Sequence, residues 1–445
     1  MTEEKLSLKE KICYALGDAS ANIAWRGICT FLLIFYTDVV GLAPAVVGLL
    51  MLIVRSSDGV TDVLMGIVGD RTKSKYGKFR PWILWTAIPL AVILSLTFTC
   101  PSGLGMTGKI VYAYVTYILF TLIYTANNIP YGALMAVMTG DDRERASVGS
   151  FRMAGAFAGG MLVQGLLLYL KDCFDSYSIP IYILSVVLAL CLLVTFWGTK
   201  ERVTPPADQK SDLWTDFRQL VTNMPWVVLL VVGLLFNVYN AVRQGITVIY
   251  FTHYLDRTAL CGVFLTVIMV ASIVGALATG PLARRFGKRN LFIATLLSAG
   301  LVNACFAFCA PTDIVAIFAI GIVGEAIAAV FPTLFFTMLG DAADFSEFVN
   351  GRRATGLVYS AGSFASKFGG GVAGAIIGMV LARYGYSGTD AATIPGAIPG
   401  IKLLMGYIPS AIVAVTAFLM FLYPLSDKRL SEITAELAKR RGRNE

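Results

Sequence analysis

Twelve apolar stretches, each long enough to cross a lipid bilayer, constrain this chain more than any other feature. A hydrocarbon core about 30 Å thick is crossed by about 20 helical residues. Only 14% of the residues are charged and the mean hydropathy is +0.72, whereas about a quarter of the residues of a soluble domain are charged. Backbone polar groups in lipid must be satisfied within the chain, so the sequence predicts an all-α integral membrane protein. The expected spans are residues 20–40, 44–67, 81–99, 109–138, 148–170, 178–198, 225–251, 260–283, 290–309, 312–340, 354–382 and 402–424.

The basic residues predict the orientation of these spans. Of the 36 Lys and Arg residues, five lie in the loops on the side opposite the N-terminus, namely Lys109, Lys171, Arg257, Arg383 and Lys402. Most of the others lie with the termini and the loops on the N-terminal side, which predicts that both termini are cytoplasmic. We therefore expect a multi-pass protein of the plasma (inner) membrane, surrounded by lipid, whose first residues are not a cleavable signal. The net charge of +8 follows from this topology and does not indicate a nucleic-acid partner.

A basic, glycine-bearing loop occurs twice, once after the second span and once after the eighth. The first copy is GIVGDRTKSKYGKFR at 66–80, and the second is GPLARRFGKR at 280–289. This loop resembles the signature loop of the major facilitator superfamily, whose six-helix halves are parallel repeats. The resemblance implies an N-terminal half at 1–198, a cytoplasmic linker at 199–223, a C-terminal half at 224–424 and a cytoplasmic tail at 425–445. The linker contains a short amphipathic run at 213–221.

Glycines recur every four residues in two spans. Gly155 and Gly159 lie in the fifth span, and Gly370, Gly374 and Gly378 lie in the eleventh. Such spacing predicts close approach of helix backbones.

The second span contains charges that lipid does not tolerate. Each ionised group near the bilayer centre costs about 2.5–3.5 kcal/mol on insertion scales. Arg55, Asp58 and Asp62 are spaced by three and four residues, so they share one helix face. Two acids and one base leave one negative charge uncompensated, and a bound cation can neutralise it. That cation is either sodium held by several oxygens or a proton on one carboxyl group. The alternative is a structural ion pair with Arg55 and Lys367.

The first span carries Asp18, Asn22 and Arg26 at a spacing of four residues, again on one face. Asp18 either faces a cavity or caps the start of its helix. Arg26 lies deeper. Its guanidinium is suited to bind a carboxylate on a substrate, or else it neutralises Asp58 or Asp62.

Further ionisable residues lie in the second half of the chain. Arg243 and Lys367 are additional cations within spans, and Glu325 is an acid whose partner the sequence does not indicate. His253, the single histidine, lies near the outer end of its span. We expect it to reach lipid headgroups.

Several short motifs together resemble the glycoside-pentoside-hexuronide:cation symporter family, which includes melibiose and glucuronide carriers. The resemblance covers nearly the whole chain. Its motifs are Tyr14-Ala-Leu-Gly-Asp18, Tyr36-Thr-Asp-Val-Val-Gly41, Arg55-x-x-Asp58-x-x-x-Asp62, Gly77-Lys-Phe-Arg-Pro-Trp82, Tyr124-Thr-x-x-Asn128-Ile-Pro-Tyr131, Asp341-Ala-Ala-Asp344-Phe-Ser-Glu347 and the region of Lys367.

The resemblance implies where the two ligands bind. The implied cation site is Asp58, Asp62 and Thr125, with Lys367 near both sites. The implied sugar-site residues are Asn22, Tyr124, Asn128 and Arg152.

The chain also departs from the melibiose carrier. It has Asn22 and Asn128 where that carrier has acids that bind sugar hydroxyls, and Gly132 where it has a stacking aromatic residue. Neutral α-galactosides are therefore disfavoured. With Arg26, Arg152 and Arg243 available, we expect an anionic sugar, a hexuronide being the leading candidate.

The sequence thus predicts a secondary transporter that couples a sugar or glycoside to a cation by alternating access, with no other cofactor. A membrane enzyme would need a metal cluster or a nucleophile with its base, and neither pattern is present in the sequence. A receptor would need a sizeable soluble domain. An amphiphile or lipid carrier, or an uncoupled facilitator, remains the alternative because a fold does not fix its substrate.

Overall fold

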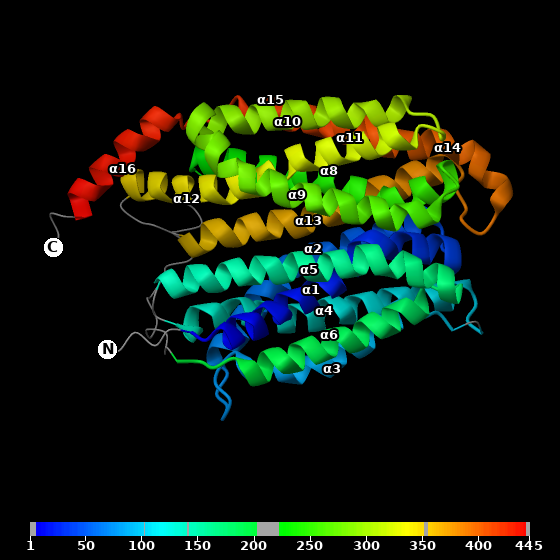
Figure 1. Cartoon of the computed structure of the whole chain (residues 1–445), viewed down its shortest axis with the longest axis horizontal. Coiled ribbons are helices and arrows are strands. Elements are labelled where there is room, and N and C mark those ends of the chain that lie inside the picture. The colour runs from blue at the N-terminus through cyan, green and yellow to red at the C-terminus, as the bar shows by residue number, and fades with distance from the viewer. Residues whose placement is uncertain (1–5, 102, 140–141, 203–221, 351–354, 442–445) are drawn as a thin grey trace. The chain divides into compact units, whose positions relative to one another are not determined.

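The described part of the chain is α-helical throughout. The computed structural model describes residues 6–101, 103–139, 142–202, 222–350 and 355–441, and these contain no strand (Figure 1). Within them, eleven helical spans are long and apolar enough to cross a membrane. Helix α2 (Pro44–Arg71), which carries the three charges of the second predicted span, is not among these eleven. The all-α membrane class is confirmed.

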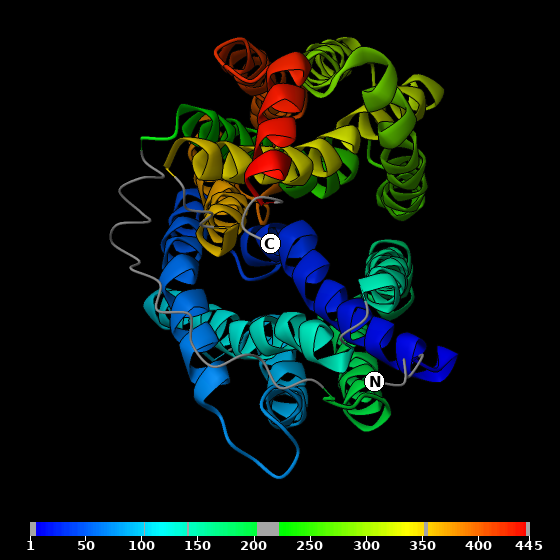
Figure 2. The same ribbon diagram turned by 90° about the vertical axis from the view of Figure 1, so that its left-hand side faces the viewer.

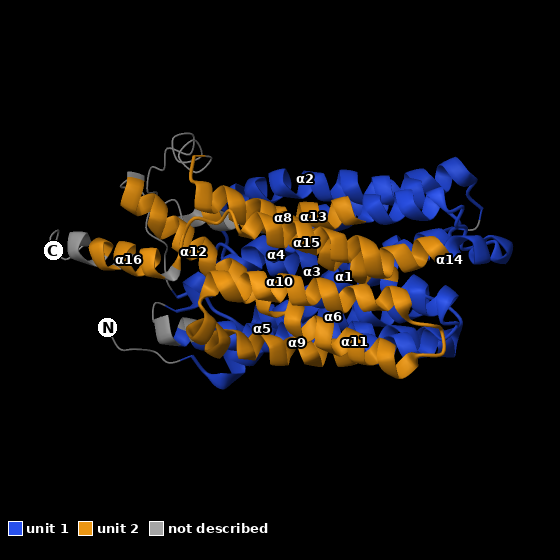
Figure 3. Cartoon of the chain, turned by 90° about the horizontal axis from the view of Figure 1, so that it is seen from above, with its two compact units in different colours: residues 1–207, 247–266, 374–398 blue, residues 208–246, 267–373, 399–445 orange. Residues whose placement is uncertain are grey.

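The contacts of the chain divide it into two compact units (Figure 3). Unit 1 contains residues 1–207, 247–266 and 374–398. Unit 2 contains residues 208–246, 267–373 and 399–445. These boundaries differ from those of the two predicted six-helix halves, which stay a prediction.

Six long helices run side by side in the first part of unit 1 (Figure 1). They are α1 (Leu8–Ile34), α2, α3 (Arg80–Thr97), α4 (Met106–Met138), α5 (Asp142–Phe174) and α6 (Ser178–Gly198), and α1 continues as a π-helix, η1 (Phe35–Val39). Ser7 caps α1 by a capping box with Glu10. The helix therefore begins twelve residues before the expected span at 20–40.

Contacts at the two ends of unit 1 show that consecutive helices alternate in direction. At one end, Arg202 after α6 pairs with Glu10 in α1 at 2.8 Å. At the other end, the Lys109 ammonium donates to the carbonyl of Val40 at 3.0 Å, and the Ser178 hydroxyl donates to the carbonyl of Phe98. Each of the six helices therefore crosses the unit once, as membrane spans must.

A hairpin joins α2 to α3 (Figure 2), and one carboxylate, that of Glu201, holds it. Glu201 accepts hydrogen bonds from the backbone N–H groups of Lys78, Phe79 and Arg80 at 2.8–2.9 Å. These N–H groups lie at the start of α3, where they have no partner within the helix. Gly77 has a φ of +107°, and a Cβ there would collide with the Glu201 carboxylate. The glycine of the first basic loop is therefore required by this turn.

Most of the glycine predictions are confirmed. A Cβ at Gly155 or Gly159 would strike the α1 backbone at Ala15 or Ala19, and Gly374 and Gly378 pack closely against α2. Gly370 is different. A Cβ there would meet nothing within 4 Å, so its predicted packing role is wrong.

Unit 2 is built from helices α8 to α16, four of which, α8, α9, α13 and α14, extend into the residues of unit 1. The helices are α8 (Met224–Ile249), α9 (Thr258–Phe286), α10 (Lys288–Ala304), α11 (Ile314–Ala328), α12 (Val330–Asn350), α13 (Thr355–Arg383), α14 (Ile394–Lys402), α15 (Ile408–Met420) and α16 (Asp427–Arg441). The π-helices η2 (Tyr250–Tyr254) and η5 (Leu403–Tyr407) follow α8 and α14, and short 3₁₀ turns lie at η3 (Cys305–Phe308) and η4 (Ala391–Thr393).

An apolar core joins α8, α10, α12 and α15 in unit 2, and its centre is aromatic. The rings of Phe236 and Phe331 stack with their centroids 3.5 Å apart. The C-terminal helix α16 belongs to this core, because Ile433 and Leu437 are buried in it. The amphipathic run predicted at 213–221 lies outside the described residues.

Candidate functional site

The central charges of α2 are buried among polar and aromatic side chains of unit 1. Asp58 has no exposed area, and Arg55 is 5% exposed. The Arg55 guanidinium donates to the Tyr117 hydroxyl at 2.9 Å and to the Cys29 sulfur at 3.2 Å, and it lies 3.9 Å from the centroid of the Trp25 ring. Asp58 is near enough to attract Arg55 electrostatically. A burial this complete is costly for ionised groups unless they are partnered.

Asp62, one turn further along α2, is half-buried and contacts α4. The Thr125 hydroxyl donates to its Oδ1 at 3.0 Å. The structure therefore brings together Asp62 and Thr125, two of the three residues that the resemblance placed in the cation site, with Asp58 on the adjacent turn.

Asp18 is an interior residue of α1 and pairs with α5. The Arg152 Nε lies 3.1 Å from its Oδ1, and the Asn22 amide donates to its backbone carbonyl at 3.0 Å. Because Ser7 is the cap of α1, the alternative that Asp18 caps the helix is wrong. Arg152 is thus held against Asp18, one turn from Asn22.

One face of α1 opens onto this polar region. Between Asp18 and Thr37, every residue of α1 and η1 is buried except Asn22, Trp25, Arg26 and Cys29, which are half-buried. Their spacing of three, one and three residues places them on one helix face.

Aromatic rings of α4 continue this surface. Tyr124 stacks on Trp25 at 5.2 Å and on Phe120 at 5.8 Å. Asn128, one turn after Tyr124, is half-buried. A Cβ at Gly132 would meet nothing within 4 Å, so the position at which the melibiose carrier has an aromatic ring borders open space here.

A second buried ion pair lies in unit 2. Arg243 on α8 donates to the Glu325 carboxylate on α11 and to the Tyr239 hydroxyl, both at 3.1 Å. The Ser272 hydroxyl on α9 donates to the other Glu325 oxygen at 3.2 Å. Glu325, for which the sequence indicated no partner, thus pairs with Arg243. Lys367 lies on α13 and is 9% exposed; its predicted place near both sites stays a prediction.

The sequence predicts that His253 contacts lipid headgroups, but in the structure it contacts a carboxylate instead. Its Nε2 lies 2.7 Å from Asp38 Oδ2, and its side chain is 16% exposed. The expectation is wrong because a nearby carboxylate satisfies the imidazole within unit 1.

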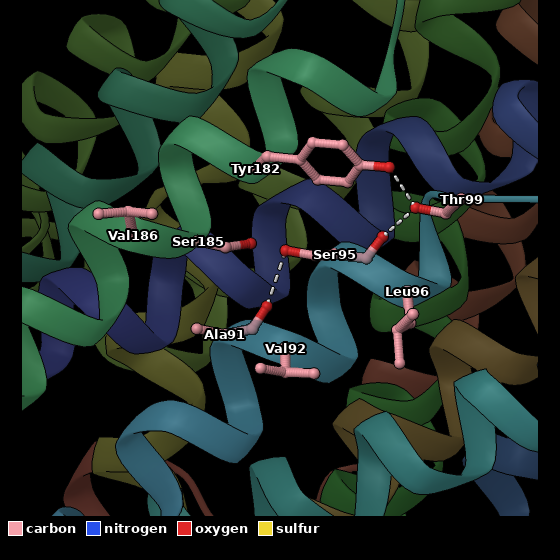
Figure 4. A pocket seen from close by; sticks show the side chains of 8 residues that line it. All are labelled: Ala91, Val92, Ser95, Leu96, Thr99, Tyr182, Ser185 and Val186. Atoms are coloured by element: carbon pink, nitrogen blue, oxygen red, sulfur yellow. Dashed lines mark hydrogen bonds between the residues drawn. The ribbon is translucent and has the colours of Figure 1, made fainter.

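An apolar groove lies between α3 and α6, apart from the charged residues above (Figure 4). Its volume is about 460 Å³, and the Tyr182 and Thr99 hydroxyls form a hydrogen bond at its edge. No sequence-predicted site residue lines it.

Sequence reasoning missed the immediate partners of the charged groups. Tyr239 could have been found because it is four residues before Arg243, on the same helix face. Tyr117, Cys29 and Ser272 lie on other helices, and nothing in the sequence links them to Arg55 or Glu325. No group of three or more His, Cys, Asp or Glu side chains that could hold a metal occurs among the described residues.

The arrangement of charged and hydroxyl groups within apolar helices agrees with comparisons to known proteins. The family model described as MFS/sugar transport protein matches residues 13–427. The chain belongs to this family. Members of the major facilitator superfamily are membrane transporters, so the chain is a multi-pass transporter and not an enzyme.

Individual relatives cover almost the whole chain. It is 34% identical to the putative glycoside/cation symporter YagG of Escherichia coli (strain K12), over 98% of this chain and 96% of that protein. It is 30% identical to the glucuronide carrier protein homolog of the same organism, over 98% and 97%. A crystal structure of a bacterial homolog of the human lysosomal transporter Spinster has the same fold, with a TM-score of 0.71 at 13% identity, covering 94% of this chain and 98% of that one.

Proposed function

We propose that this member of the MFS/sugar transport protein family carries a sugar or glycoside across the membrane together with a cation. The observation that carries this proposal is the polar cluster in α2, where the fully buried Asp58 lies one turn from the Asp62–Thr125 hydrogen bond. Intramembrane carboxylates are costly and are typical of ion pathways. Relatives named as a glycoside/cation symporter and a glucuronide carrier homolog support the same class of transport.

The proposed cation site consists of Asp58, Asp62 and Thr125. Two carboxylates and a hydroxyl offer several oxygen ligands to sodium, and either carboxyl group can instead accept a proton. Binding of the cation offsets negative charge in a region of low dielectric, and thereby strengthens substrate binding by a coupling free energy.

The proposed sugar site lies beside it, on the half-exposed face of α1 and the facing part of α4. Asn22 and Asn128 supply amides, and the stacked Trp25–Tyr124 pair supplies an apolar face of the kind on which sugar rings rest. The sequence further predicts Arg26, Arg152, Arg243 and Lys367 as cations that contact the substrate. With asparagines in place of acids, the site favours an anionic sugar, of which a hexuronide is the leading candidate.

Transport proceeds in this proposal by alternating access of the two predicted halves, 1–198 and 224–424. The protein lies in the plasma (inner) membrane with both termini in the cytoplasm, as the distribution of Lys and Arg predicts.

Uptake into proteoliposomes tests the proposal. We expect labelled glycosides to accumulate above the external concentration when either a sodium gradient or a pH gradient is imposed, and the effective gradient identifies the cation. Neutral and uronic-acid glycosides are compared in parallel. If neither gradient drives accumulation of any sugar, the protein is an uncoupled facilitator or an amphiphile carrier.

A further inference from the structure

Four arginines lie deep within the apolar helices, and three of them already have polar partners. Arg55 donates to Tyr117 and Cys29, Arg152 pairs with Asp18, and Arg243 pairs with Glu325. Arg26 has no hydrogen bond or ion pair with any residue that the structure describes. It is therefore the arginine whose donors are available to a ligand.

Arg26 opens onto the polar region of unit 1 and not onto lipid. Its neighbours on the half-exposed face of α1 identify the direction of that face: Trp25 stacks on Tyr124 of α4, and Cys29 accepts a hydrogen bond from Arg55 of α2. Asn22, one turn before Arg26, lies on the same face. A guanidinium at this depth within a membrane-spanning helix is costly without a counter-ion.

We infer that Arg26 recognises the negative charge of the substrate by forming an ion pair with a carboxylate of the sugar. The inference rests on the proposed function and deepens it. A guanidinium presents two parallel N–H donors that match the two oxygens of a carboxylate. A neutral hydroxymethyl group at the same position of the sugar leaves the charge of Arg26 uncompensated, so the site discriminates against it.

Two probes that differ only in this group test the inference. Binding of p-nitrophenyl β-glucuronide and p-nitrophenyl β-glucoside is measured with the purified wild type, with Arg26→Gln and with Arg26→Lys. We expect Arg26→Gln to raise the Kd of the glucuronide about tenfold to a hundredfold, since charge-assisted hydrogen bonds are lost, and to change that of the glucoside less than about twofold. Arg26→Lys should restore part of the affinity, because lysine keeps the positive charge but lacks the two parallel N–H donors of a guanidinium.

The control is Lys9→Gln, which removes the same charge from an exposed position of the same helix. It should change neither Kd. Equal losses for both probes in Arg26→Gln, or a wild type that binds the glucoside as well as the glucuronide, would overturn the inference while leaving sugar transport intact. A wild type that neither binds nor transports any glycoside would overturn the proposed function as well.

A second inference arises independently at the end of unit 1 where α1 ends. There Asp38 of η1 accepts hydrogen bonds from the Tyr386 hydroxyl at 2.7 Å and from Thr37 at 2.6 Å, and it lies 2.7 Å from the His253 imidazole of η2. We call Asp38, His253 and Tyr386 the Asp38 cluster. It joins a residue of the first predicted half to two residues of the second, all within unit 1.

The surroundings of the Asp38 cluster make these bonds strong. The carboxylate and the imidazole are mostly buried, at 13% and 16% exposed. Burial and the adjacent Asp38 carboxylate raise the pKa of Tyr386 far above its usual range, so its hydroxyl keeps the proton that it donates. A Cβ at Gly388 would collide with Asp38, which shows how closely the segment after α13 approaches η1. Both α1 and α8 end in π-helices here, a local geometry that is frequent at functional sites.

We propose that the Asp38 cluster is a latch that keeps this end of the unit shut while the transporter is open to the other side. In the proposed topology this end faces outward. When the predicted halves separate here during alternating access, the bonds of Asp38 to His253 and Tyr386 must break, so the latch sets how often the outward-open state forms.

Labelling of the native Cys29 tests the latch, because Cys29 lies on the α1 face that borders the polar region. A membrane-impermeant maleimide is added outside right-side-out vesicles, and Cys29 modification is measured by peptide mass spectrometry. We expect Asp38→Asn and His253→Gln to increase labelling several-fold, and Tyr386→Phe, which removes one hydroxyl, to increase it less. Asp256→Asn, an exposed change next to η2, is the control and should leave labelling at the wild-type level. Wild-type labelling in all three cluster variants would overturn the proposal.

Discussion

Asp58→Asn should abolish the accumulation of sugar against its gradient, so that the internal concentration rises only to the external one. Asp58 is fully buried in α2 beside Arg55 and one turn from Asp62. An asparagine keeps the shape of the side chain but cannot bind a proton or supply a charged ligand to sodium. The coupling free energy between cation and sugar is then lost. Exchange of labelled for unlabelled sugar at equal concentrations should persist, because it needs no net cation flux.

The measurement is proteoliposome uptake under the effective gradient, followed by the exchange assay on the same preparation. Asp62→Asn should behave similarly. Asp175→Asn is the matched control, because Asp175 is exposed and has a φ of +48°, a backbone conformation that asparagine tolerates. The cation-site assignment is wrong if Asp58→Asn still concentrates sugar as the wild type does.

Glu325→Gln should destabilise the protein strongly, by about 2–3 kcal/mol, because it leaves the buried Arg243 guanidinium without its counter-charge. The Arg243 side chain is 6% exposed, and that of Glu325 is 21% exposed. Removal of one partner of a fully buried pair costs about 3–5 kcal/mol, and the partial exposure of Glu325 reduces this figure. We expect the midpoint of thermal unfolding in detergent to fall by about 2–3 °C.

Two further variants give this experiment its controls. Arg243→Met combined with Glu325→Gln should regain most of the lost stability, because neither charge is then left buried alone. Glu432→Gln breaks the exposed Arg429–Glu432 pair of α16, whose side chains are 55% and 51% exposed, and should barely change the unfolding midpoint. If Glu325→Gln unfolds at the wild-type temperature, the ion pair contributes nothing to stability.

The spans and the pairing of Asp62 with Thr125 were accessible from the sequence. A long apolar stretch satisfies its backbone polar groups in lipid only as a helix. The motif resemblance links α2 to α4, because it places Asp62 and Thr125 in one site. The predicted boundaries of the helices were less accurate. Helix α1 begins at Leu8 because a Ser7–Glu10 capping box extends it past the apolar residues, and hydropathy does not detect such a cap.

The sequence by itself determined the fold class, the membrane environment and which charged residues needed partners, because residue type and span length are enough to show that a charge lies within an apolar helix, where it is costly. Only the tertiary structure decided which partners they have. Asp18 pairs with Arg152, Glu325 with Arg243 and His253 with Asp38, across separations of 82 to 215 positions that no helical periodicity relates. The tertiary structure also decided that Arg26, of the four arginines within the apolar helices, has donors available to a ligand. This follows from how the other helices pack, which short-range patterns in the chain do not encode.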